Sequence, residues 1–211
     1  MKQAHELLEA VRGDRLEGII VLALTTGMRR GELLGLKWQD IDFDRKVLKV
    51  RRTLDYYAGH GGYIETEPKT AKGRRSIMLP SFVVEVLRVH RVRQLEMRLS
   101  AGDRWEDLDY VFTGLLGGRL NPRYVLKLFD KLLQQVGFPH MRFHDLRHSA
   151  ATLLLSMGVD AKIVQEILGH SNISMTMDTY THVLSSMQKG AMGKWDEEFS
   201  EDEEGDKGGI V

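Results

Sequence analysis

Residues 143–170, FHDLRHSAATLLLSMGVDAKIVQEILGH, carry the clearest structural pattern in the chain. Apolar residues recur at helical spacing over 145–157, and Gly158 marks the end of that helix. Asp160 is a suitable N-cap for a second helix over 161–168. This second helix is mostly apolar, whereas the reading helix of a helix-turn-helix unit needs polar side chains. The stretch therefore predicts two core helices, with histidine and arginine at the start of the first.

Helical patterns also cover much of the remaining chain. The expected helices lie at 2–11, 14–26, 30–36, 81–99 and 122–136, and another is expected to open near Ser174. Three β-like runs, 47–53, 63–67 and 74–79, are separated by turns too short for helical crossovers, which predicts antiparallel pairing. The fold class is thus α+β, mostly α, with a small three-stranded antiparallel sheet.

The composition fits one globular domain with a short tail. The chain has 211 residues, of which 42% are apolar and 28% charged. It contains no cysteine, which excludes disulfides and thiolate metal sites. The longest apolar run, 18–26, is too short to span a membrane, and the N-terminus lacks a signal-peptide pattern. We therefore expect a cytoplasmic protein without a membrane partner.

The net charge of zero hides an uneven distribution. Residues 196–211 contain eight acidic residues and one basic residue, so the rest of the chain has 29 basic and 22 acidic residues. A basic body is compatible with a nucleic-acid partner, although an ordinary solvated surface explains the charge equally well. We expect a domain over 1–190 and a flexible acidic tail over 191–211.

Two apparent metal-binding motifs are incompatible with a metal site. Asp40, Asp42 and Asp44 alternate as in a calcium loop, but the glycine and glutamate that such a loop requires are missing. His144 and His148 have the spacing of a zinc pair, but Arg147 between them would repel a cation. No metal site is therefore expected.

Four clusters of reactive side chains remain. Arg29 and Glu32 lie on one face of a short helix, where they could also be an ordinary surface ion pair. The turn before Pro80 is dense in cations, which suits either a phosphate ligand or a solvated hairpin. The last two clusters combine histidines with an arginine and a tyrosine. The residues concerned are Lys69, Lys72, Arg74 and Arg75 in the turn, His144 and Arg147, and His170 and Tyr180.

In this order, the clusters resemble the tyrosine recombinase (phage integrase) family over residues 4–187. The family pattern is arginine in a T-G-[ML]-R-x-x-E-L box, lysine in a β-hairpin, H-x-x-R, L-G-H and then a tyrosine. The resemblance implies a phosphate site made of Arg29, Lys69, His144, Arg147 and His170, with Tyr180 as nucleophile. It also implies that Glu32 braces Arg29. Lys69 is favoured as the hairpin lysine, with Lys72 open as the alternative. Lys72, Arg74 and Arg75 are expected to contact DNA.

The implied activity is site-specific cleavage and rejoining of DNA strands through a covalent 3′-phosphotyrosine. Two guanidiniums would bind the non-bridging phosphate oxygens, so no metal or other cofactor is required. The implied partners are a double-stranded recombination site, further copies of the chain in a tetramer on DNA, and accessory directionality factors. The N-terminal DNA-binding domain usual in the family is not expected here, and the chain is interpreted as a catalytic fragment.

Two other readings stay open at this stage. A type IB topoisomerase-like enzyme would share the nucleophile and the arginines but relax supercoils without exchanging strands. An inactive DNA-binding relative would lack the chemistry altogether.

Overall fold

The structure is a computed structural model that describes residues 1–57, 62–68, 73–170 and 192. Its α-helices within these ranges are α1 (Lys2–Ala10), α2 (Glu17–Thr26), α3 (Arg30–Leu34), α4 (Ser81–Ala101), α5 (Pro122–Gln135), α6 (Asp145–Ser156) and α7 (Ala161–Leu168). Two short 3-10 helices are η1 (Trp38–Asp40) and η3 (Gly102–Arg104). The strands are β1 (Ile41–Asp42), β2 (Val47–Val50), β3 (Thr53–Tyr57), β4 (Gly62–Thr66) and β5 (Arg75–Met78).

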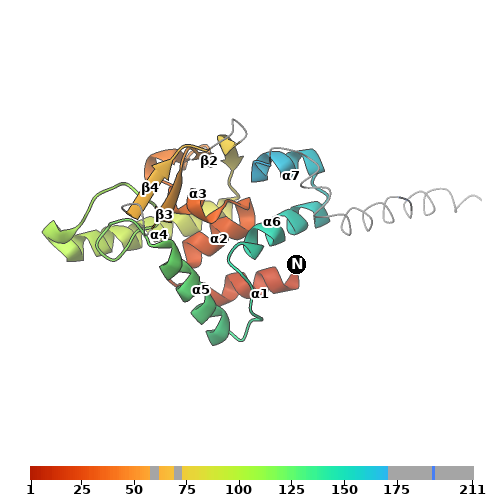
Figure 1. The fold of residues 1–211 in the computed structure, drawn as a ribbon. Coiled ribbons are helices and arrows are strands. Elements are labelled where there is room, and N and C mark those ends of the chain that lie inside the picture. Colours follow the sequence, from red (N-terminus) through yellow and green to blue (C-terminus); the bar gives the residue numbers. More distant parts are fainter. Residues whose placement is uncertain (58–61, 69–72, 171–191, 193–211) are drawn as a thin grey trace, which may run out of the picture.

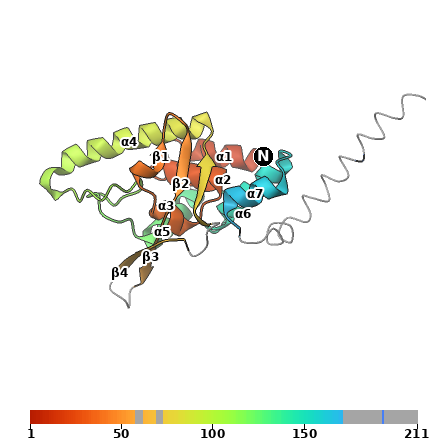
Figure 2. The same ribbon diagram turned by 90° about the horizontal axis from the view of Figure 1, so that it is seen from above.

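Helix α2 lies at the centre of the molecule (Figure 1). Every residue from Gly18 to Leu24 is buried, and the helix packs against both α4 and α6. A helix that is apolar on all sides can be stable in water only when other elements cover it on all sides. Figure 2 shows the long α4 along one side of the molecule and the β3–β4 pair projecting away on the other.

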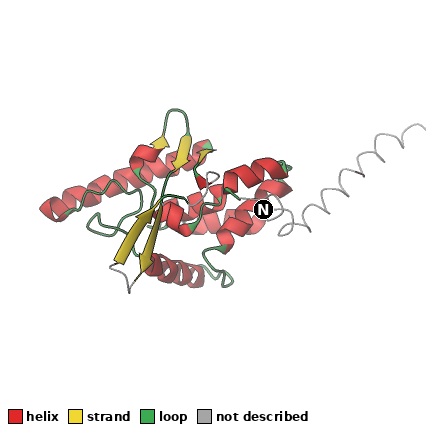
Figure 3. Cartoon of the chain, turned by 45° about the horizontal axis from the view of Figure 1, so that its top comes forward, coloured by secondary structure: helices red, strands yellow, loops and turns green. Residues whose placement is uncertain are grey.

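The strands form two separate antiparallel sheets, as Figure 3 shows. A three-stranded sheet in the order β1-β2-β5 confirms the expected fold class, but its membership differs from the prediction. Residues 63–67 do not join it, because β4 pairs with β3 instead.

The run predicted as one strand over 47–53 is divided by Arg51 and Arg52. Arg52 donates hydrogen bonds to Asp40, whose side chain is almost fully buried. A buried carboxylate needs such a partner. The chain therefore leaves β2 at Val50 and starts β3 at Thr53.

The helix boundaries follow local signals closely. The Asn121 side chain accepts a hydrogen bond from the Arg123 N–H, and Asp160 does the same for Lys162, as the N-cap interpretation predicts. Ser81, expected to be an N-cap, is instead the first residue of α4, and Pro80 precedes it. No helix in the described ranges is both long and apolar enough to cross a membrane.

Candidate active site

Gly27, between α2 and α3, is the point where the helices of the site meet. Its φ of 60° lies in the left-handed region, and its carbonyl oxygen accepts a 2.5 Å hydrogen bond from Nη1 of Arg147 on α6. A β-carbon added there would lie 2.2 Å from Cδ2 of Leu168 at the end of α7. Only glycine meets both conditions, since it tolerates this φ and has no side chain.

Arg29 and Glu32 form the pair that their spacing predicts. The Arg29 N–H donates to Oε2 of Glu32 at 2.9 Å, and Arg29 Nη1 donates to Oε1 at 3.0 Å. The side chain of Glu32 is only 3% exposed, against 43% for Arg29. The pair is therefore a buried carboxylate that holds a solvent-facing guanidinium, and not an ordinary surface ion pair.

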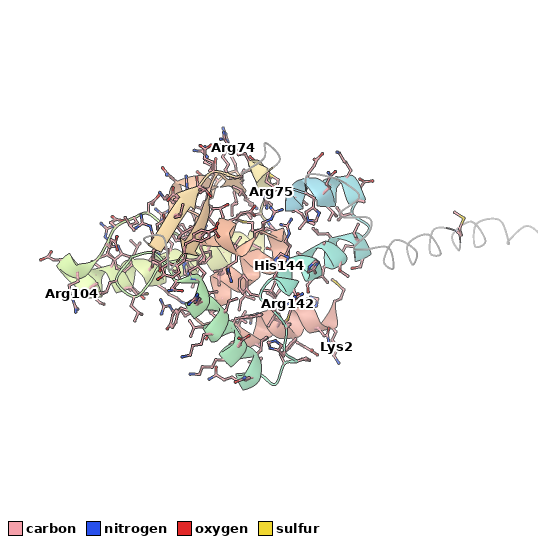
Figure 4. All side chains as sticks on the ribbon, viewed as in Figure 1. Lys2, Arg74, Arg75, Arg104, Arg142 and His144 are labelled. Atoms are coloured by element: carbon pink, nitrogen blue, oxygen red, sulfur yellow. The ribbon has the colours of Figure 1, made fainter. Side chains whose placement is uncertain are left out.

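Arg75 is the second arginine on the same carboxylate. Its Nη2 donates to Oε2 of Glu32 at 2.9 Å, and its Nη1 donates to Oε1 at 3.1 Å. Its Nε donates to the carbonyl oxygen of Ile167 on α7 at 2.6 Å. Figure 4 shows Arg75 on the α7 side of the sheet and Arg74 at the outer edge.

This placement corrects the expectation that Arg75 contacts DNA. Its side chain is 6% exposed and its donors are occupied by protein acceptors, whereas Arg74 is 59% exposed beside Glu67. The signal was present in the sequence, because alternate residues of a strand share a face. Arg75 lies two positions before the buried Ile77 and is therefore on the inner face of β5.

The ionisation of Glu32 depends on these two arginines. Burial alone raises the pKa of a carboxyl group. At Glu32 the hydrogen bonds and charges of Arg75 and Arg29 outweigh burial and hold the pKa below its usual value. Glu32 is thus a carboxylate at neutral pH and can accept from both guanidiniums.

Arg147 and His170 complete the inner part of the site, and both are buried. The backbone N–H of His170 donates to the carbonyl oxygen of Gln165, and its own carbonyl oxygen accepts from the Gln165 side chain. Burial, followed by the positive charges of Arg147, Arg29 and Arg75, lowers the pKa of His170 to about 4. The imidazole is therefore neutral at pH 7 and lies in the field of three arginines.

His144 lies at the rim, at the N-terminal end of α6. Its ring meets that of His148 edge to face at 5.2 Å between centroids. Partial burial and the nearby His148 and Arg147 lower the pKa of His144, so its ring is free to accept a proton at neutral pH. In the part of the chain that the structure describes, no cluster of three or more His, Cys, Asp or Glu side chains could hold a metal ion.

Residues 1–187 match the model of the phage integrase family. The chain belongs to this family. A XerC-like tyrosine recombinase of Caldanaerobacter subterraneus is 41% identical over 201 residues, which cover 90% of this chain and 51% of that protein. Tyrosine recombinase XerC of Corynebacterium efficiens is 34% identical, with 87% of this chain and 53% of the relative covered. The chain thus spans about half the length of the curated relatives it matches.

Solved structures of the family share the fold. The Tn1549 transposon integrase, in complex with circular intermediate DNA, gives a TM-score of 0.76 at 26% identity over 92% of this chain and 65% of that one. XerA recombinase gives a TM-score of 0.70 at 26% identity, over 90% of this chain and 63% of the XerA chain. These likenesses confirm the α+β catalytic fold predicted from the sequence.

The structure brings together four of the family-motif residues predicted for the site. They are Arg29, Glu32, Arg147 and His170, with His144 at the rim beside Arg147. Lys69, its alternative Lys72, and Tyr180 lie outside the described residues.

Proposed function

We propose that this chain cleaves and rejoins DNA strands at a specific site through a covalent 3′-phosphotyrosine. The observation that carries the proposal is the convergence of Arg29 and Arg147 on the Gly27 junction, beside a neutral, buried His170. Two guanidiniums from distant parts of the sequence are held there by protein contacts before any substrate arrives. Such preorganised donors suit a phosphodiester whose oxygens gain negative charge in the transition state.

Each side chain then has a defined task in the cleavage step. Arg29 and Arg147 bind the two non-bridging oxygens, and His170 donates a hydrogen bond from its neutral ring. The Tyr180 oxygen attacks phosphorus and passes its proton to His144, which the lowered pKa keeps available as a base. The bond from phosphorus to the 5′-oxygen breaks, and Lys69, or Lys72 in its place, protonates that oxygen.

Rejoining is the same sequence in reverse. A 5′-hydroxyl of the incoming strand loses its proton to the lysine and attacks the phosphotyrosine. Tyr180 leaves and recovers a proton from His144. The energy of the broken phosphodiester is kept in the phosphotyrosine, so the cycle consumes no nucleotide and needs no cofactor.

The proposed substrate is a double-stranded recombination site. Arg74, exposed immediately before β5, and Lys72, two residues earlier in the sequence, are the proposed contacts with the DNA backbone. Beside His144, a cleft of about 400 Å³ between α3 and α5 is lined by further basic side chains, Arg30, His140 and Arg142. A solved structure of the XerH site-specific recombinase, which resembles this chain, is bound to its difH substrate, and this supports a DNA partner here.

The wider setting is also part of the proposal. We place the catalytic domain at 1–190 and the acidic tail at 191–211, and we expect a tetramer on DNA, accessory directionality factors and a cytoplasmic location. The composition, the basic body of the chain and its family membership support these expectations.

A nicked suicide substrate tests the proposal. A pool of nicked duplexes with random sequence around the nick is incubated with the full chain, and denaturant-resistant protein–DNA adducts are isolated and sequenced. We expect adducts enriched in one sequence that form equally in excess EDTA. Strict dependence of adduct formation on Mg²⁺ would indicate a metal-dependent nuclease. Adducts without sequence enrichment, from a protein that also relaxes supercoiled DNA, would indicate a topoisomerase.

A further inference from the structure

The carboxylate of Glu32 is shared by two arginines in a symmetrical arrangement. Oε1 accepts from Arg29 Nη1 at 3.0 Å and from Arg75 Nη1 at 3.1 Å. Oε2 accepts from the Arg29 N–H at 2.9 Å and from Arg75 Nη2 at 2.9 Å. The carboxylate is thus held from two sides, by the more exposed Arg29 and by the buried Arg75.

We propose that Arg75 is a positioning residue of the active site, which fixes Glu32 and through it the guanidinium of Arg29. Through Nε it also holds the last turn of α7, three residues before His170. The inference rests on the proposed function, because it assigns Arg75 a role in the cleavage step.

A second arginine offsets the negative charge of Glu32. A carboxylate next to Arg29 holds the guanidinium in place but also cancels its charge, which weakens the attraction for a phosphate. Arg75 restores a net positive charge to the group of three without facing the substrate itself. Arg75 therefore allows Glu32 to orient Arg29 while the site keeps a field that favours an anion.

The guanidinium of Arg75 also links two segments of the chain that lie next to site residues in the sequence. Arg75 begins β5 and follows Lys69 and Lys72 in the sequence, and Ile167 precedes the Leu168-Gly169-His170 segment. A planar guanidinium can donate to a carboxylate and to a carbonyl in different directions at once, whereas an ammonium on a flexible stem cannot hold both in a fixed geometry. Arg75 therefore sets the position of α7 relative to the sheet.

The first test compares Arg75→Gln with Arg52→Gln. Arg52 is a matched control, because it also pairs with a buried carboxylate, Asp40, while its partners Asp40, Glu65 and the carbonyl oxygen of Gly35 are not residues of the candidate site. Both changes should lower thermal stability. At saturating DNA, Arg75→Gln should slow adduct formation about 10- to 100-fold, the usual effect of removing a group that orients a functional side chain. Arg52→Gln should keep a rate close to wild type, and Arg75→Lys should recover little of the loss.

Two readouts separate positioning from a merely structural role. In a Glu32→Gln background, Arg75→Gln should slow adduct formation much less than it does in the wild type, because its effect passes through Glu32. Without Arg75, the pKa of Glu32 should also rise. The variant should therefore lose cleavage rate towards acidic pH more steeply than the wild type, in which protonation of His144 alone accounts for the loss. Additive losses with an unchanged pH profile would overturn the inference.

A measurement without DNA keeps the inference separate from the proposed function. The side-chain ¹⁵N–¹H signal of Arg29, assigned through Arg29→Lys, should be sharp in the wild type and in Arg52→Gln. It should broaden in Arg75→Gln and in Arg75→Lys. An unchanged Arg29 signal in both Arg75 variants would overturn the positioning role, even if wild-type adducts form. Absence of wild-type adducts would overturn the proposed function alone.

Discussion

Nη1 of Arg147 donates a 2.5 Å hydrogen bond to the carbonyl oxygen of Gly27, which fixes α6 to the junction between α2 and α3. The bond aligns one arginine of the site against the segment that carries the other. Arg29 lies two residues after Gly27, so the position of each guanidinium depends on the same short piece of backbone.

Arg147→Lys should reduce the cleavage rate far more than a charge-preserving change usually does. An ammonium can neither bind two phosphate oxygens in a plane nor keep the contact with Gly27 at the same time. We expect a loss of about 100-fold or more in the rate of adduct formation with little change in DNA affinity. Single-turnover rates and a gel-shift titration measure the two effects. An equal loss in both would mean that Arg147 only holds the DNA backbone.

Gly27→Ala should destabilise the protein and slow cleavage. Alanine at this φ costs about 1–2 kcal/mol, and its β-carbon would displace Leu168 and hence α7. Gly13→Ala is a matched control, because Gly13 also has a positive φ but no atom within 4 Å of the added carbon. Urea unfolding should show a larger loss for Gly27→Ala. If the two losses are equal, contact with α7 does not restrict this position.

Tyr180→Phe should abolish the covalent adduct and leave DNA binding nearly intact, because only the attacking oxygen is removed. Trapping on the nicked substrate and a parallel gel-shift titration measure both effects. Tyr110→Phe serves as the control, since that hydroxyl is bound by Glu65 elsewhere in the fold. Adducts at wild-type yield from Tyr180→Phe would show that another residue is the nucleophile.

The free protein should lose stability as the pH falls from about 6.5 to about 4. The folded-state pKa of His170 is about 4, below the unfolded value of about 6.5. In this window the unfolded state binds more protons, so the free energy of unfolding decreases with decreasing pH. Chemical denaturation at several pH values should show a shallower decrease for His170→Gln than for the wild type. His5→Gln, on the exposed side of α1, is the control. Identical pH dependence in all three proteins would exclude a lowered pKa at His170.

Removal of residues 194–211 should raise non-specific DNA affinity at low salt. The segment 196–204 contains seven acidic residues, which compete with DNA phosphates for the basic body of the chain. Added salt screens both attractions, so the gain should shrink as the salt concentration rises. Fluorescence anisotropy with a random-sequence duplex measures the gain in affinity and its dependence on salt concentration. Equal affinities at low salt would mean that the tail does not cover the DNA-binding face.

The sequence by itself determined the helices and the identity of the reactive residues. The α5 and α7 caps, and the glycine that ends α2, depend on contacts within a few residues and are readable from local pattern. The order of the motifs around Arg29, His144 and Arg147 identified the family, because members of one family keep the same motifs in the same order, while the chemistry requires those residue types.

The tertiary structure decided strand membership and the role of Arg75. Strand pairing depends on partners that are distant in sequence, and the separation of β2 from β3 follows from the contact of Arg52 with Asp40. Arg74 and Arg75 are identical in chemistry and adjacent in the chain, so their composition alone cannot distinguish them. Arg74 precedes β5 and is exposed, whereas Arg75 begins the strand and reaches Glu32 and Ile167. Alternation along the strand places Arg75 on the same face as Ile77, but only the packed fold brings Glu32 and α7 against that face.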